Sequence, residues 1–189
     1  MELLVLSLDN WIGFDLRIKR SHSLISLFLF LLLIGCGKEP QDAPYDPAFD
    51  FNFPDLNGKI HSMNDFRGQI LVINFWATWC PPCVEEVPKL SNLYNRYKSR
   101  GIQVIGIALD KDSLNLLDPF VKKHGITYPI LVGNDQVVAN LSAGSLGKNF
   151  KGVPATFLFD RKGQIYKRFD GSFDLEQLEE SLQTLLNQN

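Results

Sequence analysis

The pattern of hydrophobic and polar positions predicts alternating strands and helices from about residue 48 onwards. Residues 70–76 are mostly β-branched and aromatic with little alternation, which is typical of a strand that is covered on both faces. Apolar residues then recur at three- and four-residue steps from 81 to about 99, which predicts an amphipathic helix. Gly101 ends this helix, and residues 102–109 form a second buried strand by the same criterion.

The rest of the pattern predicts a second strand-helix unit, a hairpin and a closing helix. The expected bounds are a helix at 113–123, a strand at 128–132, a short helix at 136–141, a loop at 142–151, strands at 155–159 and 164–169, and a helix at 174–186. Asp174 is placed to cap the last helix. Near the start, Phe residues alternate with other residues over 49–54, and Gly58 lies in a turn, which together predict an N-terminal β-hairpin.

Residues 1–35 have the pattern of a lipoprotein-type signal peptide. Three basic residues precede an apolar run at 24–34, which is short for a bilayer span but suits a signal-peptide core. The run ends before Cys36 in a sequence that resembles the lipobox of bacterial lipoproteins, so we expect Cys36 to carry a lipid; an uncleaved anchor helix is the alternative. Residues 36–47 are typical of a flexible tether. We therefore expect residues 48–189 in the cell envelope, outside the cytoplasm and held to a membrane, on the periplasmic side if the cell is Gram-negative.

Composition and charge restrict the classes of function that we expect for this chain. The 189 residues suit one domain together with an export segment. There are 19 basic and 21 acidic residues, and the resulting net charge of −2 gives no indication of a nucleic-acid partner. Two of the three cysteines, Cys80 and Cys83, form a Cys-x-x-Cys pair, and the third is Cys36, so we expect no framework of structural disulfides.

The Cys-x-x-Cys pair lies where the strand at 70–76 meets the following helix. Cys80 falls near the helix cap and Cys83 in its first turn, so unpaired backbone donors and the positive end of the helix dipole lie beside a thiolate. Thiol-disulfide exchange needs such a thiolate and a second thiol nearby. Pro81 and Pro82 have no backbone N–H, so two donors are missing and we expect a less stabilised thiolate and a more reducing pair.

These residues resemble the thioredoxin superfamily and, within it, the membrane-anchored TlpA/ResA-like thiol:disulfide oxidoreductases of the bacterial cell envelope. The resemblance covers roughly residues 48–187 and depends on residues 74–83, on Glu86 and Pro88, and on residues 152–157. It implies an α/β thioredoxin fold, in which helices flank a central mixed sheet. It also implies an N-terminal β-hairpin and a strand-helix insertion between the two halves of the fold.

The resemblance also assigns roles around the dithiol. It implies that Cys80 is the exposed nucleophile and Cys83 the buried resolving thiol. Thioredoxins carry an acidic residue where this chain has Asn74, and an amide cannot take a proton from Cys83. Glu86 follows Cys83 by three residues and lies on the same helical face, so we expect it to be the proton acceptor, with a raised pKa. An ordinary surface glutamate, as we expect of Glu85, is the alternative.

A client-binding surface is implied next to the two cysteines. It would be formed by Trp79, Pro81, Pro82, Val153 and Pro154. The Val153–Pro154 bond resembles the cis-proline junction of the family, which would expose the backbone groups of Val153 to a substrate strand.

Other kinds of site fit the sequence poorly. Zinc binding by the two cysteines needs further ligands, and neither His61 nor His124 has metal-like spacing. Covalent haem attachment needs a His where Val84 stands. We therefore expect no metal and no cofactor besides the Cys80–Cys83 disulfide.

The sequence thus predicts a monomeric thiol:disulfide oxidoreductase that acts on protein disulfides in the cell envelope. We expect it to be a reductant that is recharged by a membrane electron donor, and by analogy to serve cytochrome c maturation. The alternatives are a peroxiredoxin-like peroxidase, whose family lacks the Cys-x-x-Cys partner, and a non-catalytic envelope binding module.

Overall fold

The structure is a computed structural model of the chain, and it describes residues 49, 51–110, 113–134, 139 and 150–188. All of them belong to one unit of the chain, residues 43–189. The predicted signal peptide, Cys36 and the tether lie outside the described residues, as do most of the helix predicted at 136–141 and of the loop predicted at 142–151.

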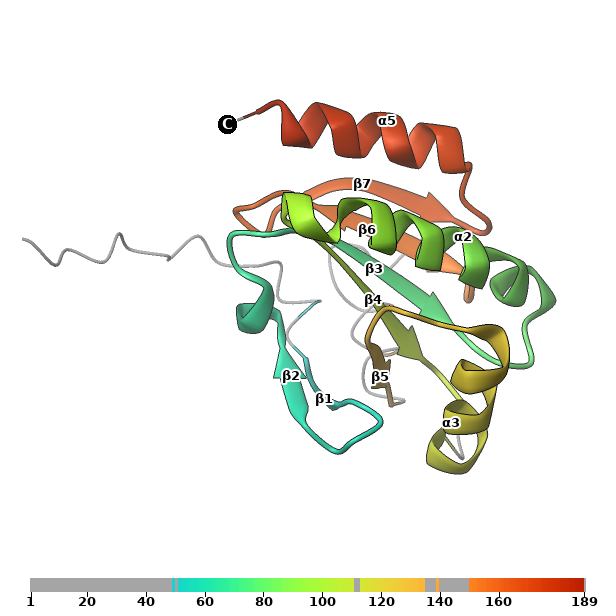
Figure 1. The fold of residues 1–189 in the computed structure, drawn as a ribbon. Helices are drawn as coiled ribbons and strands as arrows, with labels where there is room; N and C mark the ends of the chain where they lie inside the picture. Colours follow the sequence, from blue (N-terminus) through green and yellow to red (C-terminus); the bar gives the residue numbers. More distant parts are fainter. Residues whose placement is uncertain (1–48, 50, 111–112, 135–138, 140–149, 189) are drawn as a thin grey trace, which may run out of the picture. The chain divides into compact units, whose positions relative to one another are not determined.

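A mixed sheet of five strands forms the centre of the fold, in the order β5-β4-β3-β6-β7 (Figure 1). β3 (Ile70–Trp76), β4 (Ile102–Ala108) and β5 (Ile130–Val132) run parallel to one another. β6 (Ala155–Phe159) is antiparallel to β3, and β7 (Ile165–Asp170) is antiparallel to β6. The predicted mixed sheet is therefore confirmed, and the carboxyl ends of β3 and β4 lie at the same edge.

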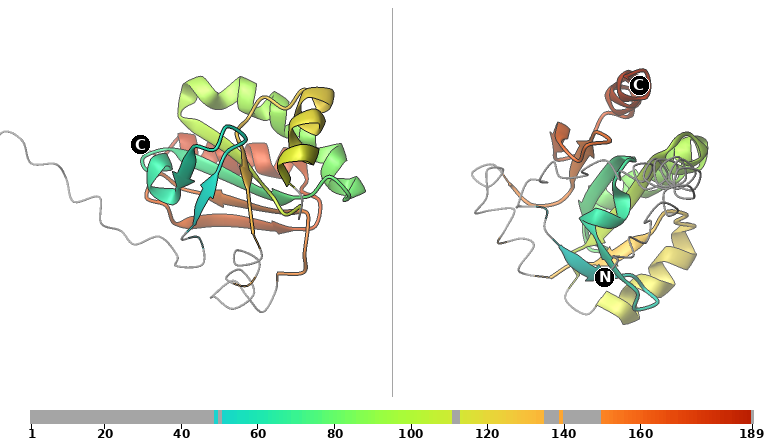
Figure 2. Two further views of the ribbon diagram at one scale, coloured as in Figure 1. Left: turned by 90° about the horizontal axis from the view of Figure 1, so that it is seen from below. Right: turned by 90° about the vertical axis from the view of Figure 1, so that its left-hand side faces the viewer.

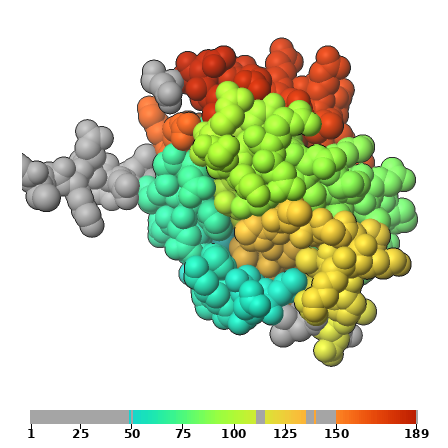
Figure 3. Space-filling view, viewed as in Figure 1, coloured from blue at the N-terminus to red at the C-terminus, as the bar shows by residue number. Residues whose placement is uncertain are grey.

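Three helices cover one face of this sheet: α2 (Pro81–Tyr97), α3 (Ser113–His124) and α5 (Leu175–Leu186). Figure 2 shows two further views of this arrangement, and Figure 3 shows α2 lying between α5 and α3. Their apolar residues share one buried cluster with Ile70, Val72 and Trp76 of β3. The helix residues of this cluster include Leu90, Leu93, Leu117, Leu178, Leu182 and Leu185. The apolar stripe of each helix thus faces the sheet, as its periodicity predicts.

Aromatic side chains fill the opposite face of the sheet. Phe49 packs edge-on against Phe157 and Phe159, with ring centroids 4.9 and 4.8 Å apart. The alternate residues of β3, Leu71, Ile73 and Phe75, complete this second cluster. β3 is consequently buried along its whole length, which explains why its sequence lacks the alternation of a half-exposed strand.

The predicted hairpin is present but shorter than the sequence suggests. It consists of β1 (Asn52–Pro54) and β2 (Ile60–Ser62), and it is followed by the short 3₁₀ helix η2 (Met63–Phe66). Because Asn52 pairs with Ser62, where β2 ends, the residues before Asn52 have no partner in this hairpin. The strand therefore cannot extend back to Phe49, whose ring instead enters the core.

The strand-helix insertion and the closing helix are also confirmed. α3 and β5 follow β4, and β5 pairs with the carboxyl half of β4, where Gly106 lies opposite Ile130. Asp174 caps α5 by accepting a hydrogen bond from the N–H of Glu176 at 2.9 Å. No helix in the described part of the chain is both long and apolar enough to span a bilayer.

Candidate active site

Cys80 and Cys83 lie at the junction of β3 and α2 and are joined by a disulfide, with their Cα atoms 5.3 Å apart. Cys80 is the N-cap of α2, and its sulfur accepts a hydrogen bond from the backbone N–H of Cys83 at 3.3 Å. Pro81 and Pro82 occupy the first two helical positions. Proline fits there because the first N–H groups of a helix have no partner within it. The donor that remains for the Cys80 sulfur is therefore the N–H of the third helical residue, Cys83.

Burial around the disulfide corrects one prediction. Cys80 is only 4% exposed and Cys83 is 1% exposed, so the prediction that Cys80 is exposed is wrong for the disulfide form. Its sulfur turns towards the buried Cys83, which removes it from solvent. The exposed residues around the motif are Pro81, Pro82 and above all Trp79, which is 69% exposed. Trp76, by contrast, is fully buried, as expected for a strand that is covered on both faces.

Glu86 is not a surface glutamate but a buried one, 1% exposed. Its carboxylate accepts hydrogen bonds from the N–H of Phe173 at 2.9 Å and from the side-chain amide of Asn74 at 3.4 Å. The Asn74 amide also donates to the hydroxyl of Thr156 in β6 at 2.9 Å. Glu86 therefore links α2 to β3 and to the loop before α5, one helical turn after Cys83.

Burial raises the pKa of Glu86 from 4.5 to about 6. The hydrogen bonds from Phe173, Asn74 and Ser172 and the charge of Lys89 oppose this shift without cancelling it. The carboxyl group can therefore gain and lose a proton near neutral pH, which is what a proton acceptor beside a dithiol requires. The prediction of a raised pKa agrees with this value.

The Val153–Pro154 peptide bond is cis, as the resemblance implies. Ala155, the next residue, pairs with Phe75, which places Pro154 at the edge of the sheet where β3 leads into the motif. Val153 is half-buried and Pro154 is buried. The structure thus brings both residues to the end of the sheet that carries Cys80.

Comparison with known proteins agrees with this geometry. The model of the AhpC/TSA family matches residues 44–168. The thiol-disulfide oxidoreductase ResA of Geobacillus thermodenitrificans is 33% identical over 139 residues, which are 73% of this chain and 75% of that protein. ResA of Bacillus cereus is 30% identical over 180 residues, which are 88% of this chain and 98% of that protein. The chain belongs to the AhpC/TSA family and to the ResA-like branch of the thioredoxin superfamily.

A solved structure supports the same assignment for the fold. The thiol:disulfide interchange protein of the thioredoxin family from Chlorobium tepidum superposes with a TM-score of 0.66 at 27% identity, over 77% of this chain and 99% of that one. The thioredoxin fold predicted from the sequence is therefore confirmed. This ResA-like protein is a thiol-disulfide oxidoreductase, and its dithiol is the Cys80–Cys83 pair.

One contact of the ResA-like site has no counterpart in the sequence analysis. Asp110 follows β4, is 5% exposed, and accepts hydrogen bonds from the backbone N–H and the hydroxyl of Thr78. A signal for it exists in the sequence, since carboxyl ends of adjacent parallel strands meet at one edge and a polar residue after the second strand can reach the loop after the first.

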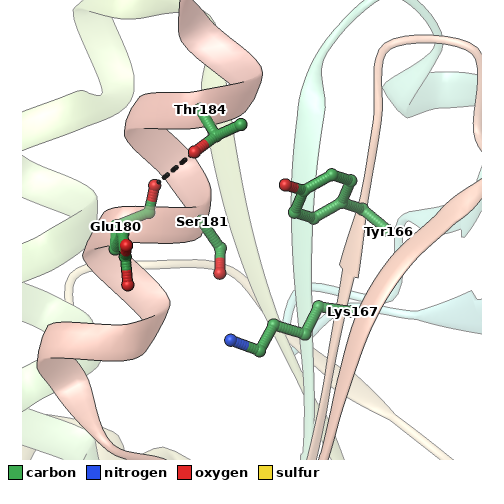
Figure 4. Close-up of a pocket in the computed structure, with 5 residues that line it drawn as sticks. All are labelled: Tyr166, Lys167, Glu180, Ser181 and Thr184. Atoms are coloured by element: carbon green, nitrogen blue, oxygen red, sulfur yellow. Dashed lines mark hydrogen bonds between the residues drawn. The ribbon is translucent and has the colours of Figure 1, made fainter.

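A hollow lies away from the dithiol, between β7 and α5. It measures about 330 Å³ and is lined by Tyr166, Lys167, Glu180, Ser181 and Thr184 (Figure 4). The hydroxyls of Ser181 and Thr184 already donate to helix carbonyls, those of Gln177 and Glu180. The residues that line this hollow do not include Cys80, Cys83 or Glu86. We therefore assign the chemistry of this ResA-like protein to the Cys80–Cys83 end of the sheet.

Within the described residues, no group of three or more His, Cys, Asp or Glu side chains is arranged to hold a metal ion. His61 instead lies between two carboxylates of the hairpin, 3.4 Å from Asp55 and 3.7 Å from Asp65. That no cofactor other than the disulfide takes part stays a prediction.

Proposed function

We propose that this ResA-like protein reduces disulfides of protein clients, and that Cys80 and Cys83 supply the two electrons. The observation that carries this direction is the proline pair at the start of α2. The Cys80 sulfur accepts a hydrogen bond from Cys83 N–H, whereas Pro82, the second proline of the pair, stands at the other helical position whose N–H could reach this sulfur and has none to offer. Fewer donors stabilise the thiolate less, which favours the disulfide form of the pair and makes the dithiol a better reductant.

The exchange proceeds in two steps. The thiolate of Cys80 attacks one sulfur of a client disulfide, which forms a Cys80–client bond and releases the other client sulfur as a thiolate. Cys83 then loses its proton to Glu86 and attacks the Cys80 sulfur, which closes the Cys80–Cys83 disulfide and releases the second client thiolate. The client disulfide gains two electrons, the dithiol loses two, and the client thiolates take up protons. A membrane-bound dithiol donor returns the protein to its reduced form.

The client would bind across the motif and the neighbouring sheet edge. Trp79 supplies an exposed aromatic surface beside the disulfide, and Pro81 and Pro82 are exposed next to it. The backbone of Val153, held by the cis bond to Pro154, would pair with an extended client segment. A client class that suits this site is a protein with two neighbouring cysteines, such as an apocytochrome c before haem attachment.

Residues 1–47 would hold the domain to the outer side of a membrane. Cys36 is the proposed lipid attachment point, and the protein would act as a monomer near membrane-bound partners. Labelling cells with a radioactive fatty acid tests this part: the full chain should take up label, and a Cys36→Ser variant should not. Equal labelling of both chains contradicts lipid attachment at Cys36.

Redox titration against glutathione tests the proposed direction. We expect a potential nearer the roughly −270 mV of thioredoxin than the roughly −120 mV of the oxidant DsbA. A potential at the oxidant end contradicts a reducing role.

Trapping experiments test the client class. A Cys83→Ser variant should accumulate mixed disulfides with protein clients through Cys80, and a Cys80→Ser variant should not. Consumption of peroxide without protein disulfide exchange would instead favour the peroxidase alternative. If the protein neither exchanges protein disulfides nor consumes peroxide, the alternative of a non-catalytic binding module is favoured.

A further inference from the structure

We infer that Asp110 is a positioning residue for the dithiol and that it acts by holding Thr78. The backbone N–H of Thr78 donates to the two oxygens of the Asp110 carboxylate at 3.2 and 3.1 Å. The Thr78 hydroxyl donates to one of these oxygens at 2.6 Å. Thr78 stands two residues before Cys80, so this contact fixes the segment that delivers the reactive sulfur.

The burial of Asp110 supports this inference, because a buried carboxylate depends on its hydrogen-bond donors. The residue is 5% exposed, and a buried carboxylate is unfavourable unless its oxygens accept hydrogen bonds. Short bonds to a carboxylate are also stronger than bonds between neutral groups. Both oxygens of Asp110 are directed to one residue, Thr78, which lies 32 positions earlier in the chain.

The contact between Asp110 and Thr78 matters for the position of the segment between β3 and α2. Trp79 is 69% exposed and therefore gives this segment little anchorage in the core. On the strand side, the N–H of Leu109 donates to the carbonyl of Trp76 at 2.9 Å, and on the helix side the N–H of Cys80 donates to the carbonyl of Ala77 at 3.2 Å. Asp110 fixes the residue between these two contacts, so the whole turn is tied to the end of β4.

The contact between Asp110 and Thr78 affects the equilibrium between the dithiol and the disulfide forms of Cys80 and Cys83. In the reduced protein, a fixed turn keeps Cys80 close to Cys83, so closing the disulfide orders little additional backbone. Without the contact, the turn gains conformational freedom in both forms of the protein. It gains less in the disulfide form, because the Cys80–Cys83 bond still restrains it there. Loss of the contact should therefore favour the reduced form and make the potential less negative. The inference rests on the dithiol activity of Cys80 and Cys83 and not on the direction of electron flow in the cell.

The test uses the full chain and three variants, Asp110→Ala, Asp110→Asn and Thr78→Val. For each, the equilibrium constant with glutathione and the alkylation rate of the reduced dithiol as a function of pH are measured. For Asp110→Ala we expect the disulfide form to be disfavoured by about tenfold, since freeing about one residue of backbone has an effect of that order. Tenfold corresponds to about 30 mV for this two-electron couple. Thr78→Val keeps the backbone contacts and should show a smaller shift of the same sign.

Two control variants separate positioning from general stability. Thr78→Ser keeps the hydroxyl and should behave as the parent. Asp160→Ala removes another loop-holding aspartate, whose carboxylate accepts from the N–H groups of Lys162 and Gln164 at 2.9 and 2.8 Å in the turn between β6 and β7. This variant should lower the melting temperature and leave the equilibrium constant unchanged.

The outcomes are distinct. If Asp110→Ala does not fold, Asp110→Asn and Thr78→Val decide the question. Folded variants with the parental equilibrium constant and alkylation profile overturn the inference, as does a shift of equal size in Asp160→Ala. If the parent protein has a potential at the oxidant end, the proposed direction of electron transfer is contradicted. The role of Asp110 is tested separately, because it depends only on the difference in equilibrium constant between variant and parent.

Discussion

The carboxylate of Glu86 accepts a hydrogen bond from the backbone N–H of Phe173, 2.9 Å away in space and 87 positions later in the chain. Glu86 lies one helical turn after Cys83, and Phe173 lies in the loop that leads into α5. This bond therefore ties the redox helix to the C-terminal helix. It also places a carboxyl group that titrates near neutral pH inside the core, where its protonation affects both stability and chemistry.

Replacement of Glu86 by Gln should change how stability depends on pH. Burial raises the pKa of Glu86 from 4.5 to about 6 in the folded chain, so between these values the folded state binds more protons than the unfolded state. The resulting stabilisation is complete below about pH 4.5 and is lost as the pH rises through about 6. Relative to Glu86→Gln, the parent should therefore lose about 2 kcal/mol of unfolding free energy between about pH 4 and about pH 7. Urea titrations at both pH values measure this difference, and parallel pH curves would show that Glu86 does not titrate in this range.

The same substitution should shift the pH profile of disulfide exchange. If Glu86 takes the proton of Cys83, a Gln at this position cannot do so, and resolution of the mixed disulfide near pH 7 should slow by about 10²-fold or more. Stopped-flow measurement of the second exchange step reports this rate. Glu85→Gln is the matched control, because Glu85 is the neighbouring glutamate but is exposed. Equal profiles for both variants would remove Glu86 from the mechanism and leave it a structural role.

Replacement of Asn74 by Ala should affect stability and the titration of Glu86 together. Asn74 is 2% exposed and donates to Thr156 and to Glu86. Its loss leaves a buried carboxylate with one donor fewer, which should cost about 1–3 kcal/mol of unfolding free energy and raise the pKa of Glu86 further. Thr156→Val removes the other bond of the same amide and should destabilise the fold with a smaller effect on Glu86. Urea unfolding gives the first quantity, and NMR titration of the Glu86 carboxyl carbon gives the second.

How far the sequence predicts this molecule depends on the range of the interaction concerned. The bounds of β3, α2 and α5 follow from local periodicity, because one buried stripe or one fully buried strand determines each of them. The contacts between Asp110 and Thr78 and between Glu86 and Phe173 join residues 32 and 87 positions apart. No local pattern encodes such pairs, since they depend on which strands and loops the fold brings to the same edge.

Burial of the reactive cysteine is a second property that local pattern does not give. The position of Cys80 at a helix start indicates donors beside its sulfur, and the bond from Cys83 N–H agrees with that expectation. The same position gives no information on how far the side chain turns inward, which the disulfide to the buried Cys83 determines.

The proline pair allows a test of how the helix start sets the redox potential. Cys80 is the N-cap, and an N-cap side chain accepts from the N–H of the second or third helical residue. Here the second is Pro82, which has no N–H, and the third is Cys83, whose N–H donates to the Cys80 sulfur. Pro82→Ala therefore adds a donor that can reach the Cys80 sulfur, whereas Pro81→Ala adds one at the first helical position, which does not point at the cap side chain. Pro82→Ala should lower the pKa of the Cys80 thiol and shift the equilibrium with glutathione towards the reduced form by about tenfold, or about 30 mV.

Pro81→Ala is the matched control for this change, since it also removes one ring and restores one N–H. It should destabilise the helix start to a similar extent while leaving the thiol reactivity close to that of the parent. The rate of Cys80 alkylation across a pH series, measured for both variants in the Cys83→Ser background, separates the two cases. If both substitutions shift the rate alike, the missing donor at Pro82 is not what makes this dithiol reducing, and the helix dipole or the surrounding burial must set its potential instead.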